Sequence, residues 1–221
     1  MIQIAHIESP FDSKFGIPRQ TGLAQVTARV VFEPPYRVAE AVRGLEEFDY
    51  VWLIWQFHMN ERQEWSPTVR PPRLGGNRRM GVFATRSPFR PNSIGLSAVR
   101  LTGVEMTSSV GPVLHLSGAD MANGTPIFDI KPYIPYADAF PDARSGFAAG
   151  APTATLTVED PEGITTEMDT TLREGLFQSL AQDPRPRYQH DSKRVYTVTY
   201  SGREISFRID NGRLIIVKKT M

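Results

Sequence analysis

The sequence of 221 residues contains no cysteine. This absence excludes disulfide bonds, thiolate catalysis and cysteine-ligated metals, and it suits a reducing compartment such as the cytoplasm. Long hydrophobic runs are missing too, since the longest, Tyr50–Phe57, is far shorter than the about 20 residues that cross a bilayer. The first residues show no basic segment followed by an apolar stretch, so no secretory signal is visible. We therefore expect a cytoplasmic protein without a membrane association.

Several familiar active-site motifs are also absent. The sequence has no G-x-G-x-x-G segment after a strand, which leaves a dinucleotide-type Rossmann site without support. It has no Walker A motif and no G-x-S-x-G elbow. The histidines lie far apart and form no metal motif, so no metal is expected; they are His6, His58, His115 and His190.

The net charge of +1 conceals a segregation of charge along the chain. No acidic residue lies between Glu64 and Glu105, and that stretch carries seven arginines. From Pro184 onward, nine basic residues face three acidic ones. Such blocks give a local positive field, unless acids from elsewhere balance them in the fold. Both interpretations stay open, although the guanidinium fork of arginine suits phosphate and carboxylate.

The first two thirds of the chain read mainly as strands. One helix is predicted over Arg37–Phe48, where apolar residues recur at helical spacing. Many strands with few helices favour an antiparallel barrel or sandwich over alternating βαβ units. The predicted strands are Ala24–Phe32, Tyr50–Phe57, Gly81–Thr85, Leu96–Met106, Val113–Ser117 and Pro126–Lys131.

The last third predicts a small α+β unit. Gly150–Gly163 has the composition of a linker, and Met168, Leu172, Leu176 and Leu180 then form a helical stripe, with Thr166 and Asp169 as a capping pair. Ser201-Gly202 and Asn211-Gly212 are turn signals between three further strands, which predicts two hairpins. We place the two domains at residues 1–152 and 153–221.

One loop stands out as a binding loop, within Gly81–Ser97. Arg86 and Arg90 lie four residues apart around Ser87-Pro88-Phe89, and Pro91 follows. Two prolines restrict the backbone, so this loop can hold two guanidinium groups with little entropy left to lose on binding. The alternative is a rigid surface turn with solvated arginines. The stiffness and the intervening aromatic favour binding.

A second polar cluster is predicted on the strand after the Asn123-Gly124 turn. Asp129, Lys131 and Tyr133 should point to one side, because side chains alternate along a strand. An exposed edge strand would give the same pattern. The two tryptophans of the Tyr50–Phe57 strand are expected to be core residues.

In these segments the chain resembles the TrmO-type (TsaA-like) family of tRNA methyltransferases. The ATRSPFRPN and DIKPY segments are the most specific, and the resemblance covers nearly the whole chain. Asn123 departs from the Asp often found there. The matching pieces are Phe15–Gln20, Arg70–Gly95, Asn123–Pro126, Asp129–Tyr133 and Gln182–Pro186.

The resemblance implies an N-terminal antiparallel β-barrel that binds S-adenosylmethionine (SAM), a small C-terminal α+β domain and a homodimer. It also implies methylation of N6 of N6-threonylcarbamoyladenosine beside the anticodon of threonine tRNA. On that basis we expect these residues to bind the cofactor: Pro18, Arg19, Gln20, His58, Arg86, Leu96, Gly124, Thr125, Pro126 and Ile127.

The remaining roles are hypotheses about the reaction. Asp129 or Asp138 would serve as the base, with Lys131 and Tyr133 orienting the acceptor. Arg90 and Asn92 would anchor the SAM carboxylate or the RNA, and Arg185 with the basic hairpins of Arg194–Lys219 would hold phosphates of the anticodon loop. Two alternatives remain: a non-enzymatic RNA-binding module, or a SAM-dependent enzyme that acts on a small molecule or protein.

Overall fold

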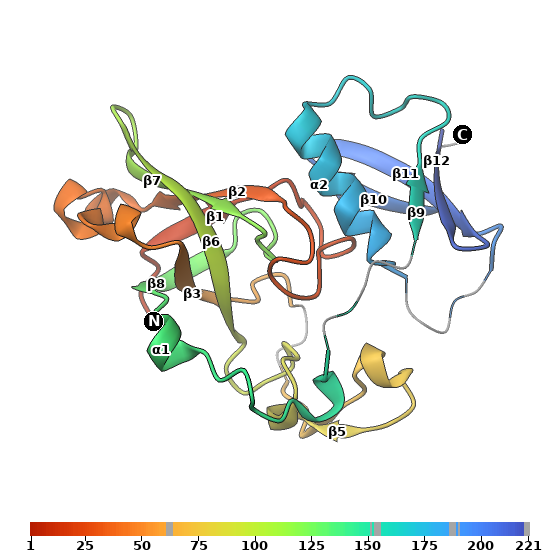
Figure 1. The fold of residues 1–221 in the computed structure, drawn as a ribbon, viewed down its shortest axis with the longest axis horizontal. Coiled ribbons are helices and arrows are strands. Elements are labelled where there is room, and N and C mark those ends of the chain that lie inside the picture. The colour runs from red at the N-terminus through yellow and green to blue at the C-terminus, as the bar shows by residue number, and fades with distance from the viewer. Residues whose placement is uncertain (61–63, 151, 153–155, 186–188, 190, 219–221) are drawn as a thin grey trace.

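Six antiparallel strands close a barrel in the computed structural model, in the order β1-β2-β7-β6-β3-β8 (Figure 1). The model describes residues 1–221 except 61–63, 151, 153–155, 186–188, 190 and 219–221. Closure leaves no strand of the barrel with an unpaired edge. The predicted antiparallel barrel is thereby confirmed, and a sandwich is excluded. The barrel strands are β1 (Ala5–Glu8), β2 (Thr27–Phe32), β3 (Tyr50–Gln56), β6 (Ile94–Thr107), β7 (Gly111–Ser117) and β8 (Pro126–Pro132).

Strand β3 shows how the sequence fills the barrel. Val51, Leu53 and Trp55 point inward and are buried, whereas Trp52 and Ile54 between them are partly exposed. This alternation follows from the period of two along a strand. Residues of the other five strands complete the same core, among them Ile7, Val30, Val99, Leu114 and Ile127.

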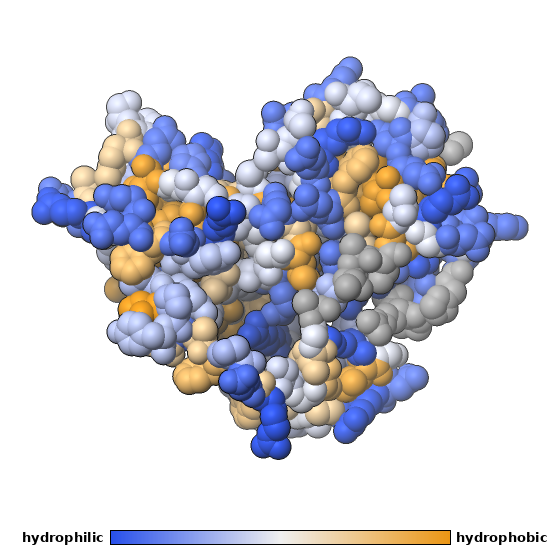
Figure 2. All heavy atoms as spheres, in the orientation of Figure 1, coloured by the Kyte–Doolittle hydropathy of each residue, from blue (hydrophilic) through white to orange (hydrophobic). Residues whose placement is uncertain are grey.

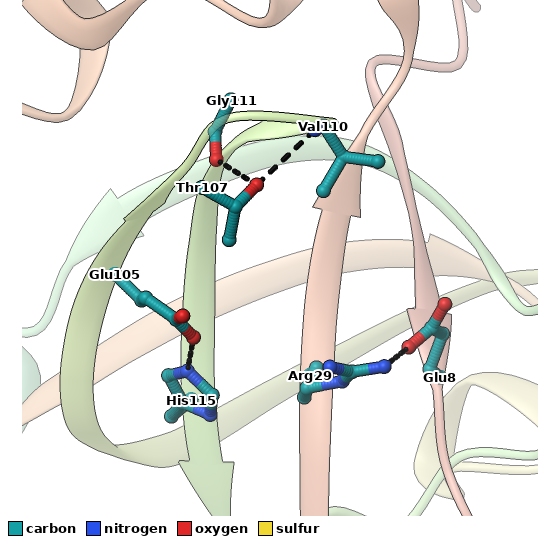
Figure 3. A network of polar contacts seen from close by, with 7 residues as sticks. All are labelled: Glu8, Arg29, Glu105, Thr107, Val110, Gly111 and His115. Carbon is teal, nitrogen blue, oxygen red and sulfur yellow. Dashed lines mark hydrogen bonds and ion pairs between the residues drawn. The ribbon is translucent and has the colours of Figure 1, made fainter.

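Polar side chains link neighbouring strands around the barrel (Figure 3). His115 on β7 and Glu105 on β6 approach to 2.8 Å, and Arg29 on β2 forms an ion pair with Glu8 on β1. Thr107 closes the β6–β7 turn, because its hydroxyl donates to the carbonyl of Gly111 and accepts from the backbone N–H of Val110. These contacts are partly exposed, and each is expected to contribute about 1 kcal/mol or less.

Two sequence predictions in the barrel region are wrong. The segment predicted as one helix, Arg37–Phe48, forms two short 3-10 turns, Ala39–Val42 and Leu45–Glu47. Gly44 separates them in the left-handed conformation, with φ of 82°, and so interrupts any continuous helix. Of the predicted strand Gly81–Thr85, only Gly81 belongs to a strand, β5 (Met80–Gly81), and the 3-10 turn Val82–Ala84 follows.

A lobe lies below the barrel in Figure 1 and contains little regular structure. Its sheet consists of β4 (Thr68–Val69) and β5 (Met80–Gly81). Hydrophobic and hydrophilic residues lie side by side on its surface in Figure 2. The lobe and the segment that leads to it contain the helix α1 (Pro135–Asp138) and the 3-10 turns Pro72–Leu74 and Gly146–Ala148. A further 3-10 turn, Pro34–Tyr36, lies on the barrel side.

The C-terminal part is a four-stranded sheet covered by one helix, which confirms the predicted α+β unit and adds a strand to the three that were predicted. Its order is β10-β11-β12-β9, with β9 (Thr157–Glu159) parallel to β12 inside the segment predicted as linker. The helix is α2 (Thr170–Ala181), and the strands are β10 (Tyr196–Tyr200), β11 (Arg203–Asp210) and β12 (Arg213–Val217). Both predicted hairpin turns form, with positive φ at all four turn residues. Of the described helices, none combines the length and apolarity needed to cross a bilayer.

The first turn of α2 corrects the predicted cap. Asp169 is the N-cap itself, and its carboxylate accepts the backbone N–H groups of Thr171 and Leu172 at 2.9 and 3.2 Å. Thr166 lies outside the helix and donates its hydroxyl to the carbonyl of Gly163. A carboxylate at this position satisfies two otherwise unpaired helix donors.

The N-terminal segment connects the two parts. After β1 the chain runs into the core of the C-terminal part, where Phe11 is fully buried and its ring meets Tyr200 edge-on at 5.2 Å. Ala24 and Val26 belong to the same core. Backbone contacts continue the join, since Ser201 donates to the carbonyl of Pro10 and Gly202 donates to the Asp12 carboxylate. The loop between Phe11 and Ala24 is therefore held at both ends by the second core.

We expect Phe11→Ala to lower the free energy of unfolding by about 3–5 kcal/mol, because it leaves a large cavity in this core. It should also loosen the loop that follows, and so speed amide exchange of residues 12–22 and tryptic cleavage at Arg19. Met106→Ala, at an exposed residue of β6, is the control and should change neither. Unchanged exchange in Phe11→Ala would contradict the anchoring of this loop.

Candidate functional site

A cavity of about 660 Å³ opens where β3 ends and β6 begins. Such a volume lies in the ordinary range for small-molecule sites. A smaller hollow of about 210 Å³ adjoins it and shares Arg86, Ser97 and Asp120 with it. The main cavity takes its lining residues from within five segments: 14–20, 52–60, 85–90, 94–97 and 120–125.

A glycine allows the indole of Trp55 to lie against β6. Gly95 faces Trp55 across the β3–β6 pair, and a Cβ atom on Gly95 would lie 2.2 Å from the ring atom Cε2. No side chain other than hydrogen fits at that distance. The ring also packs on Phe57, with centroids 4.3 Å apart. The absence of a side chain at Gly95 thus sets the position of the cavity wall.

A buried hydrogen-bond chain runs from this indole to a carboxylate. Trp55 Nε1 donates to the hydroxyl of Ser97 at 3.0 Å, and that hydroxyl donates to Oδ1 of Asp120 at 2.9 Å. Burial raises the pKa of Asp120 to about 6, although the hydrogen bond from Ser97 and the charge of Arg86 both lower it. Asp120 therefore changes its charge close to neutral pH, unlike an ordinary aspartate.

The predicted arginine loop forms one side of the cavity. The side chain of Arg90 is held by nearby backbone, since its guanidinium donates to the carbonyl oxygens of Val82 and Thr85 at 3.2 and 2.7 Å. Arg86 donates to the side-chain carbonyl of Gln20 and so ties this loop to the N-terminal loop. The two loops together place guanidinium charge next to Asp120.

The remaining walls are neutral or apolar. Burial lowers the pKa of His58, which leaves the ring uncharged at neutral pH, and its Nδ1 lies 3.3 Å from the hydroxyl of Thr125. Leu96 is 55% exposed on the cavity side of β6, an unusual exposure for a leucine on a barrel strand. The cavity therefore offers an apolar surface beside its charged groups.

The structure brings eight of the predicted site residues to the main cavity and two more to the adjoining hollow. Those at the main cavity are Pro18, Arg19, Gln20, His58, Arg86, Arg90, Leu96 and Thr125. Tyr133 and Asp138 line the hollow, where the Asp138 carboxylate accepts hydrogen bonds from Trp52 Nε1 and the backbone N–H of Ile134.

The other predicted site residues line neither space. Ile127 is fully buried in the barrel core, and Pro126 pairs with His6. Asp129 and Lys131 form an ion pair of 3.0 Å with each other on β8, at 44% and 62% side-chain exposure. Gly124 and Asn92 also lie outside the lining.

Arg185 is paired within its own domain. Its guanidinium donates twice to the Asp183 carboxylate, both at 2.9 Å, and is only 14% exposed. This pairing raises the pKa of Arg185 and makes the side chain a poor partner for an external phosphate. Arg213 and Lys218 in the basic hairpins also lie near carboxylates, Glu159 and Glu162. Arg187 and Lys219 lie outside the described residues.

The sequence analysis missed three residues at the centre of the site. Trp55 was predicted to be a core residue. It is indeed buried, but it also forms part of the cavity wall. Ser97 and Asp120 carry no motif of their own. One available signal was the serine at an inward position of an otherwise apolar strand, because a buried hydroxyl needs a partner. Within the described residues, no group of three histidine or carboxylate side chains could hold a metal ion.

Comparison with known proteins identifies relatives along the whole chain. A family model described as the tRNA-methyltransferase O N-terminal domain matches residues 6–139, and the TrmO C-terminal domain model matches residues 155–219. A "tRNA (adenine(37)-N6)-methyltransferase" of Escherichia coli K12 is 42% identical, over 94% of this chain and 92% of its own. A protein of the same name from Eikenella corrodens is 46% identical, over 76% of this chain and 95% of its own length.

Solved structures agree with these sequence relatives. A crystal structure of TrmO superposes with a TM-score of 0.77 at 36% identity, covering 97% of this chain and 95% of the other. The structure of TrmO from Pseudomonas aeruginosa gives the same TM-score and identity, with coverage of 97% and 93%. The likeness therefore extends over both folded parts.

We expect Gly95→Ala to displace the Trp55 indole and break its bond to Ser97, because the new methyl group would overlap the ring. Overpacking of this kind costs about 1–3 kcal/mol in unfolding free energy. The control is Gly103→Ala on the same strand, where a Cβ meets nothing within 4 Å. Thermal unfolding and tryptophan fluorescence should change in Gly95→Ala only. Equal behaviour of the two variants would refute the packing argument.

Proposed function

The chain belongs to the tRNA-methyltransferase O family, and on that premise we propose that it transfers a methyl group from SAM to N6 of adenosine 37 of tRNA. Two things support the proposal: the family match over both domains and a cavity with the chemistry that this cofactor needs. The finer substrate, N6-threonylcarbamoyladenosine of threonine tRNA, is part of the same proposal and follows from the resemblance of the ATRSPFRPN and DIKPY segments.

Residues of the main cavity suit two groups of SAM. The cofactor has a carboxylate, an ammonium, a flat adenine and a sulfonium, and it supplies an electrophilic methyl group. Arg86, held by Gln20, suits the carboxylate because guanidinium pairs with it in a bidentate manner. Leu96 offers an unusually exposed apolar surface for the adenine. The cofactor proposal rests on these residues of the main cavity.

A surface for the RNA is proposed on the lobe next to the cavity. Trp65 and Phe83 are 49% and 71% exposed and stacked, with ring centroids 6.4 Å apart. The guanidinium of Arg90 lies 5.6 Å from the Phe83 ring, so this aromatic pair is continuous with the cavity wall. Exposed aromatics with arginines are the usual platform for unpaired bases. The anticodon loop is single-stranded, and its bases can leave the stack at modest cost.

We also propose that the protein forms a homodimer and works in the cytoplasm, where its tRNA substrate is found. Two exposed aromatic side chains support a further contact surface: Tyr136 and Phe140 are 89% and 73% exposed, near α1. They lie in the segment that leads from the barrel to the lobe.

Two other functions make different predictions. A non-enzymatic RNA-binding module would bind tRNA without SAM, and an enzyme with another substrate would bind SAM without methylating tRNA. We expect SAM to raise the melting temperature of the protein, and this shift should be lost in Arg86→Gln. With tRNA from cells that lack this gene, mass spectrometry of nucleosides should show the N6-methylated product. A thermal shift without methylated nucleoside would favour the second alternative.

We expect tRNA affinity to fall steeply with salt, because phosphate contacts release counterions. Phe83→Ala should weaken binding by about 1–3 kcal/mol, the typical effect of losing one stacked base. Arg79→Ala, at an exposed arginine of the lobe, should lower the salt slope by about one. Met106→Ala is the control with an exposed apolar residue elsewhere. A flat salt dependence, or equal affinities of Phe83→Ala and the control, would remove this surface from the proposal.

A further inference from the structure

Asp120 occupies the junction of the two cavities. It lies in the segment that joins β7 to β8, and it lines both the main cavity and the adjoining hollow. Its neighbours Ala119 and Met121 are buried, each at 1% exposure, so the backbone here has little freedom. The carboxylate therefore lies where the two spaces adjoin.

The hydrogen-bond chain fixes the orientation of this carboxylate. Ser97 receives the indole N–H of Trp55, so its own hydroxyl hydrogen is available for Asp120 Oδ1. The donors to this carboxylate are neutral, the Ser97 hydroxyl and the backbone N–H of Asp120 itself, while Arg86 acts on it through its charge. The indole and hydroxyl are themselves fixed, because Trp55 packs on Gly95 and Ser97 is 5% exposed.

The other carboxylates near the site have structural partners instead. Asp138 accepts two hydrogen bonds from the fold, from Trp52 and from the backbone of Ile134, both to Oδ2. Asp129 lies outside both cavities in an ion pair with Lys131. Both carboxylates are therefore already bound by groups of the fold. Among the described carboxylates, Asp120 is the one that lines both cavities.

We propose that Asp120 is the general base of the methyl transfer, an inference that rests on the proposed function. Its carboxylate takes the proton of the acceptor N6 while the nitrogen electron pair bonds to the methyl carbon. The carbon–sulfur bond breaks, and its electron pair stays on the sulfur as a neutral thioether. The N6 nitrogen of adenine is a poor nucleophile while it keeps its proton. A base aligned with that proton therefore lowers the activation barrier of methyl transfer.

The surroundings of Asp120 determine the pH at which it can act. Arg86 is the charged residue whose positive charge lowers the pKa of Asp120. The other charged or titratable side chains that line the two cavities, besides His58, are Lys14, Arg19, Arg90, Tyr133 and Asp138. His58 is neutral at pH 7 because burial lowers its pKa. Burial of Asp120 outweighs these charges, and its pKa of about 6 means that it is protonated below and ionised above that pH. The methylation rate should therefore rise with pH through about 6 and then level off.

The test compares Asp120→Asn with Asp142→Asn, the same change at an exposed loop position. We expect the single-turnover rate of Asp120→Asn at pH 7.5 to fall by about 10²–10⁴-fold, with SAM affinity by calorimetry and the melting temperature unchanged. Asp142→Asn should keep the rate. Ser97→Ala should move the acidic limb of the profile to higher pH, because the loss of its hydrogen bond raises the pKa of Asp120 further.

A measurement without turnover completes the test. In protein with ¹³C-labelled aspartate carboxyl groups, one resonance should titrate with a midpoint near pH 6. In Ser97→Ala the midpoint of this titration should move to higher pH, and in Asp120→Asn the resonance should be missing. Full turnover by Asp120→Asn overturns the inference, as does a loss confined to SAM affinity, which would make Asp120 a cofactor ligand. An Asp138→Asn variant that alone loses the rate would also overturn it. Inactivity of the wild-type protein on tRNA would instead refute the proposed function.

Discussion

The insertion of the N-terminal segment into the core of the C-terminal part constrains the rest of the structure. Phe11, Ala24 and Val26 pack among residues of α2 and β10–β12, although they lie next to barrel strands in the sequence. The loop between them, which supplies Pro18, Arg19 and Gln20 to the cavity, is therefore held by the second domain and not by the barrel alone. The C-terminal part thus shapes the site, although none of its described residues lines the main cavity.

The site combines two kinds of rigidity that have different origins. The Arg86–Arg90 loop is held by hydrogen bonds to its own backbone and to Gln20, so its positive charges are fixed before any ligand binds. The Trp55–Ser97–Asp120 chain is held by burial within the barrel end. Because these charged groups are already in place, less free energy is lost in ordering them when a ligand binds. The cavity lining therefore combines the guanidinium groups of the arginine loop with the Asp120 carboxylate and the apolar Leu96.

Sequence reasoning succeeded where a local rule decides the structure. The existence of strand β3, the Asn211-Gly212 turn and the stiff arginine loop each follow from a few neighbouring residues. It failed where distant residues decide. β9 forms in a linker-like segment because β12 is there to pair with it. The helix prediction over Arg37–Phe48 failed for a local reason instead, because Gly44 interrupts the pattern that the apolar spacing supports. Asp120 gains its properties from Ser97 and from burial, which no local pattern reveals. The domain boundary near residue 152 stays a prediction.

The absent motifs noted at the start have a physical explanation in this site. Glycine-rich loops before a helix serve to bind phosphate, because helix N-termini present unpaired N–H groups and a positive dipole end. The proposed cofactor carries no phosphate, and its carboxylate can be bound by a guanidinium side chain on a proline-stiffened loop. A barrel with an arginine loop at one end therefore needs no Rossmann architecture. The phosphates that matter belong to the RNA, and the same arginine-rich stretch, free of acidic residues between Glu64 and Glu105, extends from the cavity wall onto the lobe where they would lie.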